Sequence, residues 1–272
     1  MSSTVDQAFV QQFEMDVHLA FQRQGSKLRN TVRTQTGVRG SSTTFQKIGQ
    51  GLAQQKSRHG QVPPMNADHS AVACAMQDWY AGDWVDRLDE IKIDKDEKAA
   101  LAQTGAFALG RKADDLIITE LDKTTVEAAT TAGGLTLDKV KEAFEILGAN
   151  DIPFDGDLWA VVGFKQWNDL LSIPEFASSD FVTDSIFTTA VEAKRWMGTI
   201  WMPHTGLPLD AASTRSCFWF HKRAAGHAIG AEVTTDISWH GDHAAHFVNN
   251  YMSMGACLIQ EEGVVRIKAA EV

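Results

Sequence analysis

The chain has 272 residues, of which 44% are hydrophobic and 22% charged, a composition typical of a soluble globular protein with a buried core. No apolar run approaches the roughly 20 residues of a membrane-spanning helix, and the N-terminus has no apolar signal core, so neither a membrane protein nor an exported protein is expected. Cys74, Cys217 and Cys257 lie far apart in the sequence and in no C-x-x-C pair, which predicts reduced, buried thiols in a cytosolic setting.

The charge is divided unevenly along the chain, whose formal net charge is −10. The stretch from Val17 to Gly60 contains no Asp or Glu, and the first 60 residues hold eight basic and three acidic residues. The rest of the chain is strongly acidic. This segregation predicts that a basic N-terminal arm contacts something negative, either nucleic acid or the acidic body of another copy.

The first predicted element in chain order is a helix over residues 4–24, where apolar residues recur at spacings of three or four from Val5 to Ala20. One narrow apolar stripe cannot form a core alone, so this helix is expected to dock on another surface.

A long two-stranded hairpin follows, with strands over residues 41–48 and 69–76 on either side of a polar, glycine-punctuated loop. An isolated hairpin is marginal in water, and this one contains few apolar residues. It is therefore either disordered or laid on another surface.

Residues 78–97 reverse the charge and offer a surface complementary to the basic arm. The alternative interpretation is a solvated acidic face that leads into a helix N-terminus. Asp94 suits the N-cap of that helix, and Glu97 stands where a capping box places its carboxylate.

The helix itself is predicted over residues 94–122, with a continuous apolar stripe from Leu101 to Leu121. Gly105 and Gly110 each cost about 1 kcal/mol relative to alanine inside a helix, which indicates close packing there.

The middle of the chain predicts a small α/β unit. Thr136 begins a helix that stops at Gly148, a buried strand covers residues 157–163, and a helix covers 164–172. Residues 173–190 are predicted to be an irregular loop.

The C-terminal third predicts mostly antiparallel β structure. The candidate strands are residues 195–202, 217–221, 233–239, 243–259 and 264–268.

Candidate chemistry is sparse in this sequence. His240, His243 and His246 form an H-x-x-H-x-x-H run, but on a strand His243 faces away from the other two, and on a helix the three spread over about 120°. Packed or surface histidines are therefore favoured over a metal site. Because there is no P-loop, G-x-S-x-G or H-E-x-x-H motif, we predict no cofactor and no enzymatic activity.

The order of elements and five local stretches resemble the major capsid proteins of tailed bacteriophages, which have the Hong Kong 97-type fold. The resemblance covers nearly the whole chain. The stretches are GSKLRNTVR (25–33), DWYAGDWVDRLDE (78–90), GRKADDLIITELD (110–122), KRWMGTIWMPHTGL (194–207) and WHGDHAAHFVNNYMS (239–253).

This resemblance implies an α+β capsid fold with four parts. Residues 1–35 would be an N-terminal arm and 36–77 an extended β-hairpin loop. A peripheral domain would combine 78–133 with 226–272 around a spine helix at 94–122, and residues 134–225 would be an α/β axial domain.

The resemblance also implies a function. The chain would be a major capsid protein that self-assembles into pentamers and hexamers of an icosahedral shell enclosing double-stranded DNA, located in the virion and assembled in the host bacterial cytoplasm. The implied partners are other copies of the chain, a scaffolding protein, a portal and non-specifically packaged double-stranded DNA, without a membrane. Because about 93 residues precede the spine helix, scaffolding is expected as a separate chain or as a segment removed before this sequence begins.

We expect the basic arm and loop of one copy to contact acidic surface on its neighbours. The basic contact residues are Arg23, Lys27, Arg29, Arg33, Arg39, Lys47, Lys56 and Arg58. The acidic contact residues are Asp78, Asp83, Asp86, Asp89 and Glu90.

Three alternatives remain open at this point. The first is a DNA-organising protein that uses the basic arm, although only Phe21 and Phe45 interleave its charges and a stacking platform is poorly supported. The second is a non-viral protein-shell compartment of the same fold. The third is a metal-dependent enzyme at His240, His243 and His246.

Overall fold

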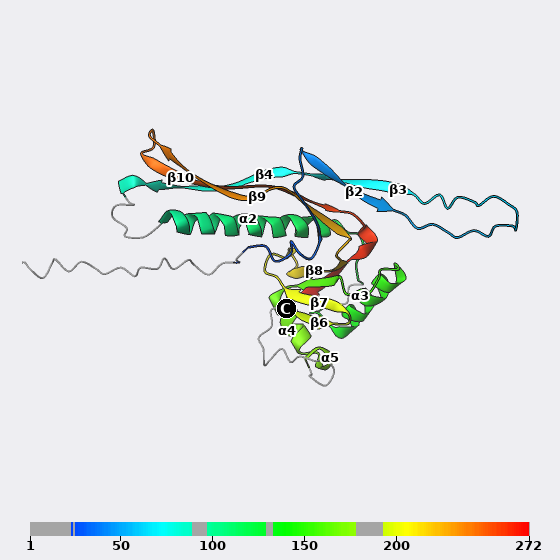
Figure 1. The fold of residues 1–272 in the computed structure, drawn as a ribbon. Helices are drawn as coiled ribbons and strands as arrows, with labels where there is room; N and C mark the ends of the chain where they lie inside the picture. The colour runs from blue at the N-terminus through cyan, green and yellow to red at the C-terminus, as the bar shows by residue number, and fades with distance from the viewer. Residues whose placement is uncertain (1–22, 24, 89–96, 129–132, 178–192, 272) are drawn as a thin grey trace, which may run out of the picture. The chain divides into compact units, whose positions relative to one another are not determined.

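The computed structural model describes residues 23, 25–88, 97–128, 133–177 and 193–271 (Figure 1). The chain divides into two compact units. Unit 1 contains the described residues within 1–25, 78–111 and 232–252, and unit 2 contains those within 26–77, 112–231 and 253–272. The predicted helix over 4–24 lies almost wholly outside the described residues.

Unit 2 contains a five-stranded sheet with the strand order β11-β8-β5-β7-β6. Its central strand β5 has the sequence LWAVV and is buried almost throughout, as a continuous apolar run predicts for a strand covered on both faces. Strand β5 runs parallel to β7 and antiparallel to β8. The strands are β5 (Leu158–Val162), β6 (Lys194–Trp196), β7 (Thr199–Pro203), β8 (Thr214–His221) and β11 (Val264–Ala270).

The single strand predicted over 195–202 is wrong, because β6 and β7 are two antiparallel strands of a tight hairpin. Trp196 pairs with Thr199, and the two residues between them, Met197 and Gly198, have φ values of 51° and 72°. Two successive positive φ values are the pattern of a type I′ hairpin turn. Methionine is not a usual residue for this turn. The apolar sequence therefore gives no sign that a turn divides the two strands.

Three helices accompany this sheet, and α3 and α4 confirm the helices predicted at 136–148 and 164–172. Thr136 occupies the N-cap of α3, although its side chain makes no capping hydrogen bond. The irregular segment predicted over 173–190 is wrong at its start, where Pro174 opens a short helix with a preset φ. The helices are α3 (Leu137–Ala149), α4 (Phe164–Leu171) and α5 (Pro174–Ala177).

The longest described helix, α2 (Glu97–Leu121), confirms the predicted helix over its described part. Its residues 97–111 belong to unit 1 and 112–121 to unit 2. No described helix is long and apolar enough to cross a membrane. The buried positions of its apolar stripe are Gly105, Leu109, Ala113, Ile117 and Leu121.

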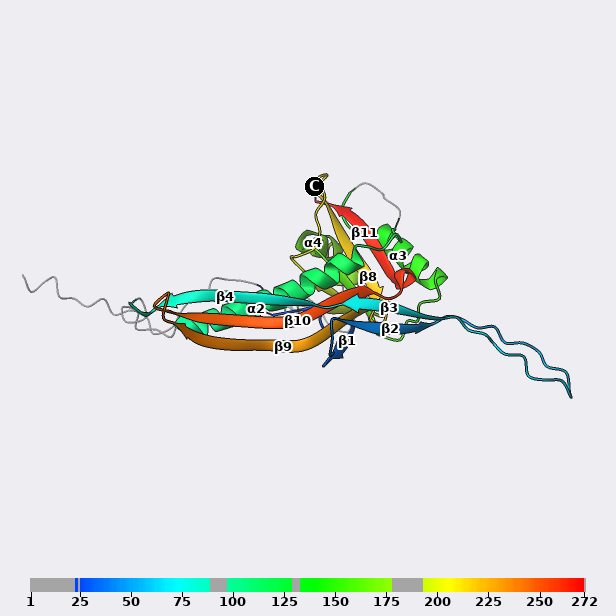
Figure 2. The same cartoon turned by 90° about the horizontal axis from the view of Figure 1, so that it is seen from above.

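A four-stranded sheet has the order β1-β9-β10-β4, and Figure 2 shows β10 between β4 and β9. Strand β1 pairs in parallel with the beginning of β9, from Arg33 opposite Gly226 to Thr36 opposite Ile229. The strand predicted at 233–239 is confirmed as a part of β9, and the strand predicted at 243–259 is confirmed as β10, which begins two residues later and ends one residue earlier. The four strands are β1 (Arg33–Thr36), β4 (Gln77–Asp86), β9 (Ala225–His240) and β10 (Ala245–Leu258).

The interpretation of 78–97 as an acidic lead-in to a helix is wrong for its first part, which is strand β4. Aromatic and β-branched residues such as Trp79, Trp84 and Val85 favour a strand. The acids of β4 are exposed at the edge of the sheet, where charged side chains are tolerated and oppose further strand pairing.

The predicted hairpin is confirmed. Strands β2 (Ser42–Ile48) and β3 (His69–Ala75) pair antiparallel in unit 2, from Ser42 opposite Ala75 to Ile48 opposite His69. Residues 49–68 form the loop that joins them.

Gly105 confirms the close packing that a glycine inside α2 predicts. A Cβ atom at this position would lie 2.1 Å from Asn250 Nδ2 and 3.1 Å from the Ala81 carbonyl oxygen. Asn250 cannot move aside freely, because it accepts a hydrogen bond from the Thr235 hydroxyl (2.6 Å) and donates one to the Ala81 carbonyl (3.3 Å). Helix α2 therefore approaches β4 and β10 at a distance that only glycine permits.

The first prediction concerns this contact. Gly105→Ala should lower the free energy of unfolding by about 1–3 kcal/mol through overpacking, despite the better helix propensity of alanine. Gly148→Ala in α3 is the matched control, because a Cβ there meets nothing within 4 Å, and it should raise stability by up to about 1 kcal/mol. Urea unfolding followed by circular dichroism measures both, and equal effects would contradict the close approach.

Candidate functional site

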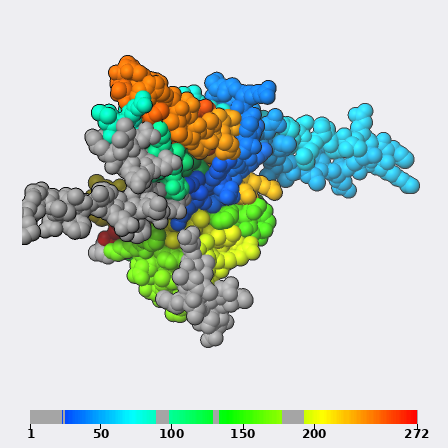
Figure 3. Space-filling model, turned by 60° about the vertical axis from the view of Figure 1, so that its left-hand side comes forward, coloured from blue at the N-terminus to red at the C-terminus, as the bar shows by residue number. Residues whose placement is uncertain are grey.

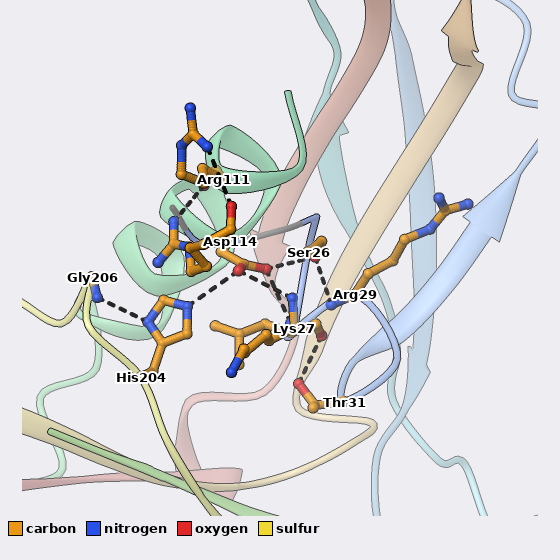
Figure 4. Close-up of polar contacts among 10 residues, drawn as sticks. Ser26, Lys27, Arg29, Thr31, Arg111, Asp114, His204 and Gly206 are labelled. Atoms are coloured by element: carbon orange, nitrogen blue, oxygen red, sulfur yellow. Dashed lines mark hydrogen bonds and ion pairs between the residues drawn. The ribbon is translucent and has the colours of Figure 1, made fainter. Parts of the chain in front are cut away.

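Asp114 of α2 is the centre of a buried polar network in unit 2 (Figure 4). Its Oδ1 accepts hydrogen bonds from the Ser26 hydroxyl (2.5 Å) and the Leu28 backbone N–H (3.0 Å). Its Oδ2 accepts the Lys27 backbone N–H (3.1 Å) and lies 3.1 Å from His204 Nε2. The carboxylate thus ties the start of the basic arm to α2 and to the segment after β7.

His204 is held in one tautomer by this network. The Gly206 backbone N–H donates to His204 Nδ1 at 3.1 Å, so the ring proton is on Nε2 and points at Asp114. In a catalytic triad the histidine stands between the nucleophile and the acid. Here Asp114 stands between Ser26 and His204, so the histidine is not placed to take the Ser26 proton.

The electrostatics of the network favour an ionised Asp114. Burial by itself would raise the pKa of this carboxyl. The hydrogen bonds from His204, Ser26, Leu28 and Lys27 outweigh burial, and the pKa lies below its ordinary value. The arrangement is therefore a structural anchor, in which hydrogen-bond donors of the protein take the place of water around the carboxylate.

The β2–β3 hairpin is anchored at its base by a second, small core in unit 2. This core contains Phe45 of β2 and Cys74 of β3, which pack with Ala228, Cys257 and Ile259. Both hairpin residues are buried, whereas most of their neighbours along β2 and β3 are exposed. The base of the hairpin is thus fixed on the body of its unit, although the hairpin has no core of its own.

The loop beyond the base has an exposed apolar and basic surface. Leu52, Val62 and Met65 are 82%, 76% and 57% exposed, and Lys56 and Arg58 are also exposed. Figure 3 shows this loop (light blue) projecting from the rest of its unit. A set of apolar side chains this exposed is typical of a surface that another molecule covers.

A cavity of about 560 Å³ lies beside the hairpin base and is lined by residues of β2, the end of α3 and the segment before β11. Lys47 Nζ lies 3.7 Å from Glu262 Oε2 beside this cavity. His221 also lines it, with Nε2 3.1 Å from Asp155 Oδ1 and Nδ1 accepting the Arg223 N–H.

The structure places the predicted basic contact residues in different surroundings. Lys47 is paired with Glu262 of its own chain. The Arg33 guanidinium lies 5.4 Å from the centre of the Phe45 ring, which is a cation–π contact. Arg23 donates to the Arg111 carbonyl, and Arg111 donates to the Arg23 carbonyl, each at 3.2 Å.

The remaining basic residues divide into two groups. Lys27 and Arg29 belong to the start of the arm, where their backbone N–H groups donate to Asp114 and to the Ser26 hydroxyl. Arg39, Lys56 and Arg58 are exposed. A neighbouring molecule can therefore reach these three side chains.

The predicted acidic contact residues lie on β4 where they are described. Asp78, Asp83 and Asp86 are exposed, and the last two accept hydrogen bonds from the nearby backbone N–H groups of Trp84 and Leu88. Asp89 and Glu90 lie outside the described residues.

The three histidines of the H-x-x-H-x-x-H run are separated by the turn between β9 and β10. His240 and His243 both pack on Trp84, at ring-centre distances of 5.1 and 4.5 Å, whereas His246 packs on Trp239 at 5.0 Å. The turn reverses the chain between His240 and His246, so the run lies neither on one strand nor on one helix. Within the described ranges, no three His, Cys, Asp or Glu residues are grouped to hold a metal ion.

Sequence patterning did not identify Asp114, Ser26 or His204 as a set. A weak signal exists, because Asp114 is one residue from Ala113 and three from Ile117, within the buried stripe of α2. A carboxylate on an apolar stripe predicts a buried partner, but nothing in the sequence identifies a histidine 90 positions away.

Comparison with known proteins gives one family and many related structures. The family model described as phage capsid protein matches residues 5–271 of the chain. No curated protein matches this chain.

Three solved structures illustrate the likeness. A structure from Mycobacterium phage Che8 is 16% identical with a TM-score of 0.73, covering 96% of this chain and 97% of that one. The capsid of Cyanophage P-SCSP1u is 15% identical with a TM-score of 0.74, covering 100% and 96%. The capsid of a native GTA particle is 14% identical with a TM-score of 0.74, covering 99% of each chain. These likenesses confirm the predicted α+β fold of the Hong Kong 97 type.

The second prediction concerns the Asp114 network. Asp114→Asn should lower the free energy of unfolding by about 2–4 kcal/mol, because the amide places a donor against donors in a buried site. Asp236→Asn, at an exposed position of β9, is the control and should change stability by less than about 0.5 kcal/mol. Chemical denaturation measures both, and similar losses would show that Asp114 is not an anchor.

The third prediction is the pH dependence of the same anchor. Because the pKa of Asp114 is lowered in the folded chain, its stabilisation is complete above the ordinary aspartate pKa and is lost as pH falls through the folded-state value. Stability of the native sequence should therefore fall more steeply below about pH 4 than that of Asp114→Asn. Thermal unfolding across acidic buffers measures the slopes, and parallel curves would contradict the assignment.

Proposed function

This chain belongs to the phage capsid protein family, and we propose that it is the major capsid protein of a tailed bacteriophage, whose copies form the pentamers and hexamers of an icosahedral shell around double-stranded DNA. The role is structural, without catalysis. The observation that carries the proposal is the loop at 49–68, which is apolar, basic and exposed on a hairpin with an anchored base.

The loop needs a partner for its apolar side chains. Leu52, Val62 and Met65 are mostly exposed, and burial of apolar surface stabilises by about 25 cal/mol per Å². The described part of the same chain does not cover them. A neighbouring copy supplies the covering surface at every contact of a shell.

Charge supports a contact between unlike surfaces of two copies. Arg39, Lys56 and Arg58 are exposed on the hairpin segment, and exposed Asp78, Asp83 and Asp86 lie on β4. A contact between two different surfaces of identical chains is head-to-tail, and such contacts close into rings when the rotation permits. Rings of five and six copies are the capsomers of the proposed shell.

The contacts are individually weak. An exposed ion pair contributes about 0–1 kcal/mol, so a single loop does not hold two copies together for long. A closed shell repeats the contact at every copy. The particle is therefore stable as a whole while wrong contacts can separate during assembly.

The proposal keeps the division into an arm (1–35), an extended loop (36–77), a peripheral domain (78–133 and 226–272) and an axial domain (134–225). It includes a separate scaffolding protein and a portal as partners, non-specific contact with packaged double-stranded DNA, and assembly in the host bacterial cytoplasm.

The fourth prediction tests the loop. Lys56→Glu should raise the protein concentration needed for shell assembly by about fivefold, because one favourable ion pair becomes repulsive at every contact. Lys141→Glu, at an exposed lysine of α3, is the matched control for charge reversal. Sedimentation velocity and negative-stain electron microscopy measure assembly, and circular dichroism confirms the fold of each variant.

Two outcomes would contradict the proposal. If Lys56→Glu forms closed particles at the same protein concentration as the native chain, the loop does not take part in the contact between copies. A native chain that forms only small oligomers and shifts DNA in a salt-dependent way would instead favour the DNA-organising alternative.

A further inference from the structure

Two of the three cysteines, distant in sequence, meet at the base of the β2–β3 hairpin. Cys74 of β3 is 0% exposed and Cys257 of β10 is 5% exposed, and both belong to the small core around Phe45. Both are free thiols, and their side chains are hydrogen-bonded to each other. A packing role alone does not require two thiols in contact.

The backbones of the two strands that carry these cysteines lie close together. A Cβ atom on Gly255 would lie 2.0 Å from the Ala75 carbonyl oxygen. Strand β10 therefore approaches the backbone of β3 so closely at this point that only glycine fits there. Residues two apart on a strand point to the same side, so Cys257 points toward β3 as the missing Gly255 side chain would. Cys74 is next to Ala75, at the point of closest approach.

A cavity reaches one member of the pair, Cys257, which is in contact with the buried Cys74. This cavity of about 250 Å³ is lined by Cys257, by Ala73 and Ala75 of β3, and by Leu116 and Glu120 of α2. Its volume is sufficient for a molecule such as hydrogen peroxide.

We propose that Cys74 and Cys257 are an oxidation site, at which peroxide converts the two thiols into a disulfide that ties the hairpin base to β10. The link lies within one chain. It therefore goes beyond the proposed shell function and does not depend on it.

The chemistry balances with peroxide as the oxidant. The Cys74 thiolate attacks one peroxide oxygen and the O–O bond breaks. Hydroxide leaves, and Cys74 becomes a sulfenic acid. Cys257 sulfur then attacks the sulfenic sulfur, the S–O bond breaks, and the Cys257 proton leaves with the hydroxide as water. Two electrons pass from the two sulfurs to the peroxide.

The electrostatics agree with these roles. The hydrogen bond from Cys257, which is the largest effect, lowers the pKa of the Cys74 thiol despite burial and the nearby Glu120 carboxylate. The same hydrogen bond, followed by burial, raises the pKa of Cys257. Cys74 is thus the better thiolate, and Cys257 is the thiol that resolves the sulfenic acid.

The third cysteine is a control within the same chain. Cys217 is buried in the main core of unit 2, where desolvation raises its pKa to about 12. It should remain a thiol when the folded chain is oxidised.

The test treats the soluble full-length chain with hydrogen peroxide, then alkylates the remaining thiols and maps the peptides without reduction. We expect a Cys74–Cys257 peptide pair lacking two hydrogen masses, alkylated Cys217, and a rise in the thermal midpoint that a phosphine reductant reverses. Cys217→Ser should form the same disulfide as the native chain and show the same rise in thermal midpoint. Cys257→Ala should show neither the disulfide nor the rise in thermal midpoint.

The same oxidation of the urea-unfolded chain shows whether the fold brings the pair together. Loop closure favours nearby residues in an unfolded chain, so Cys217–Cys257 should then exceed Cys74–Cys257. The proposal is overturned if the folded chain gives no Cys74–Cys257 link, gives sulfinic acids without a link, or gives the same pairing as the unfolded chain.

Discussion

The buried carboxylate of Asp114 is the constraint on which the arrangement of unit 2 depends. A charge at 0% exposure is stable only when its oxygens are saturated with hydrogen bonds. The donors come from Ser26, from the backbone at Lys27 and Leu28, and from His204. The start of the arm and the segment after β7 must therefore both reach α2, or the charge is left without its partners.

A second histidine repeats this geometry at the other end of the central strand β5. His204 follows β7, and its backbone N–H donates to the Val162 carbonyl at one end of β5. His221 ends β8 and pairs with Leu158 at the opposite end. In both, Nδ1 accepts the backbone N–H two residues later and Nε2 meets an aspartate. The main sheet is thus fixed at both ends by a histidine whose ring is oriented by a backbone N–H on Nδ1 and an aspartate on Nε2.

The local elements of this fold could be predicted from the sequence, and the contacts between distant segments could not. The β2–β3 hairpin, α2, α3 and β5 follow from periodicity and apolar runs, although α3 passes the predicted stop at Gly148 and ends at Ala149. Strand β4 is missed because its acids outweigh its aromatic residues in a composition-based interpretation, although an edge strand tolerates both. Asp114 with His204, and Cys74 with Cys257, are brought together only by the packing of strands and helices far apart in the chain.

The hairpin shows how one chain can combine a fixed contact with an adaptable one. Its base is buried with Phe45 and Cys74 in a small core, and its loop keeps Leu52 and Val62 exposed. A free base would add the entropy of ordering the whole hairpin to the cost of every contact between copies. Because the base is already ordered, only the loop would have to be ordered in the contact between copies that we propose, and weak contacts would then be sufficient. A disulfide at the base would strengthen this preorganisation without joining one copy to another.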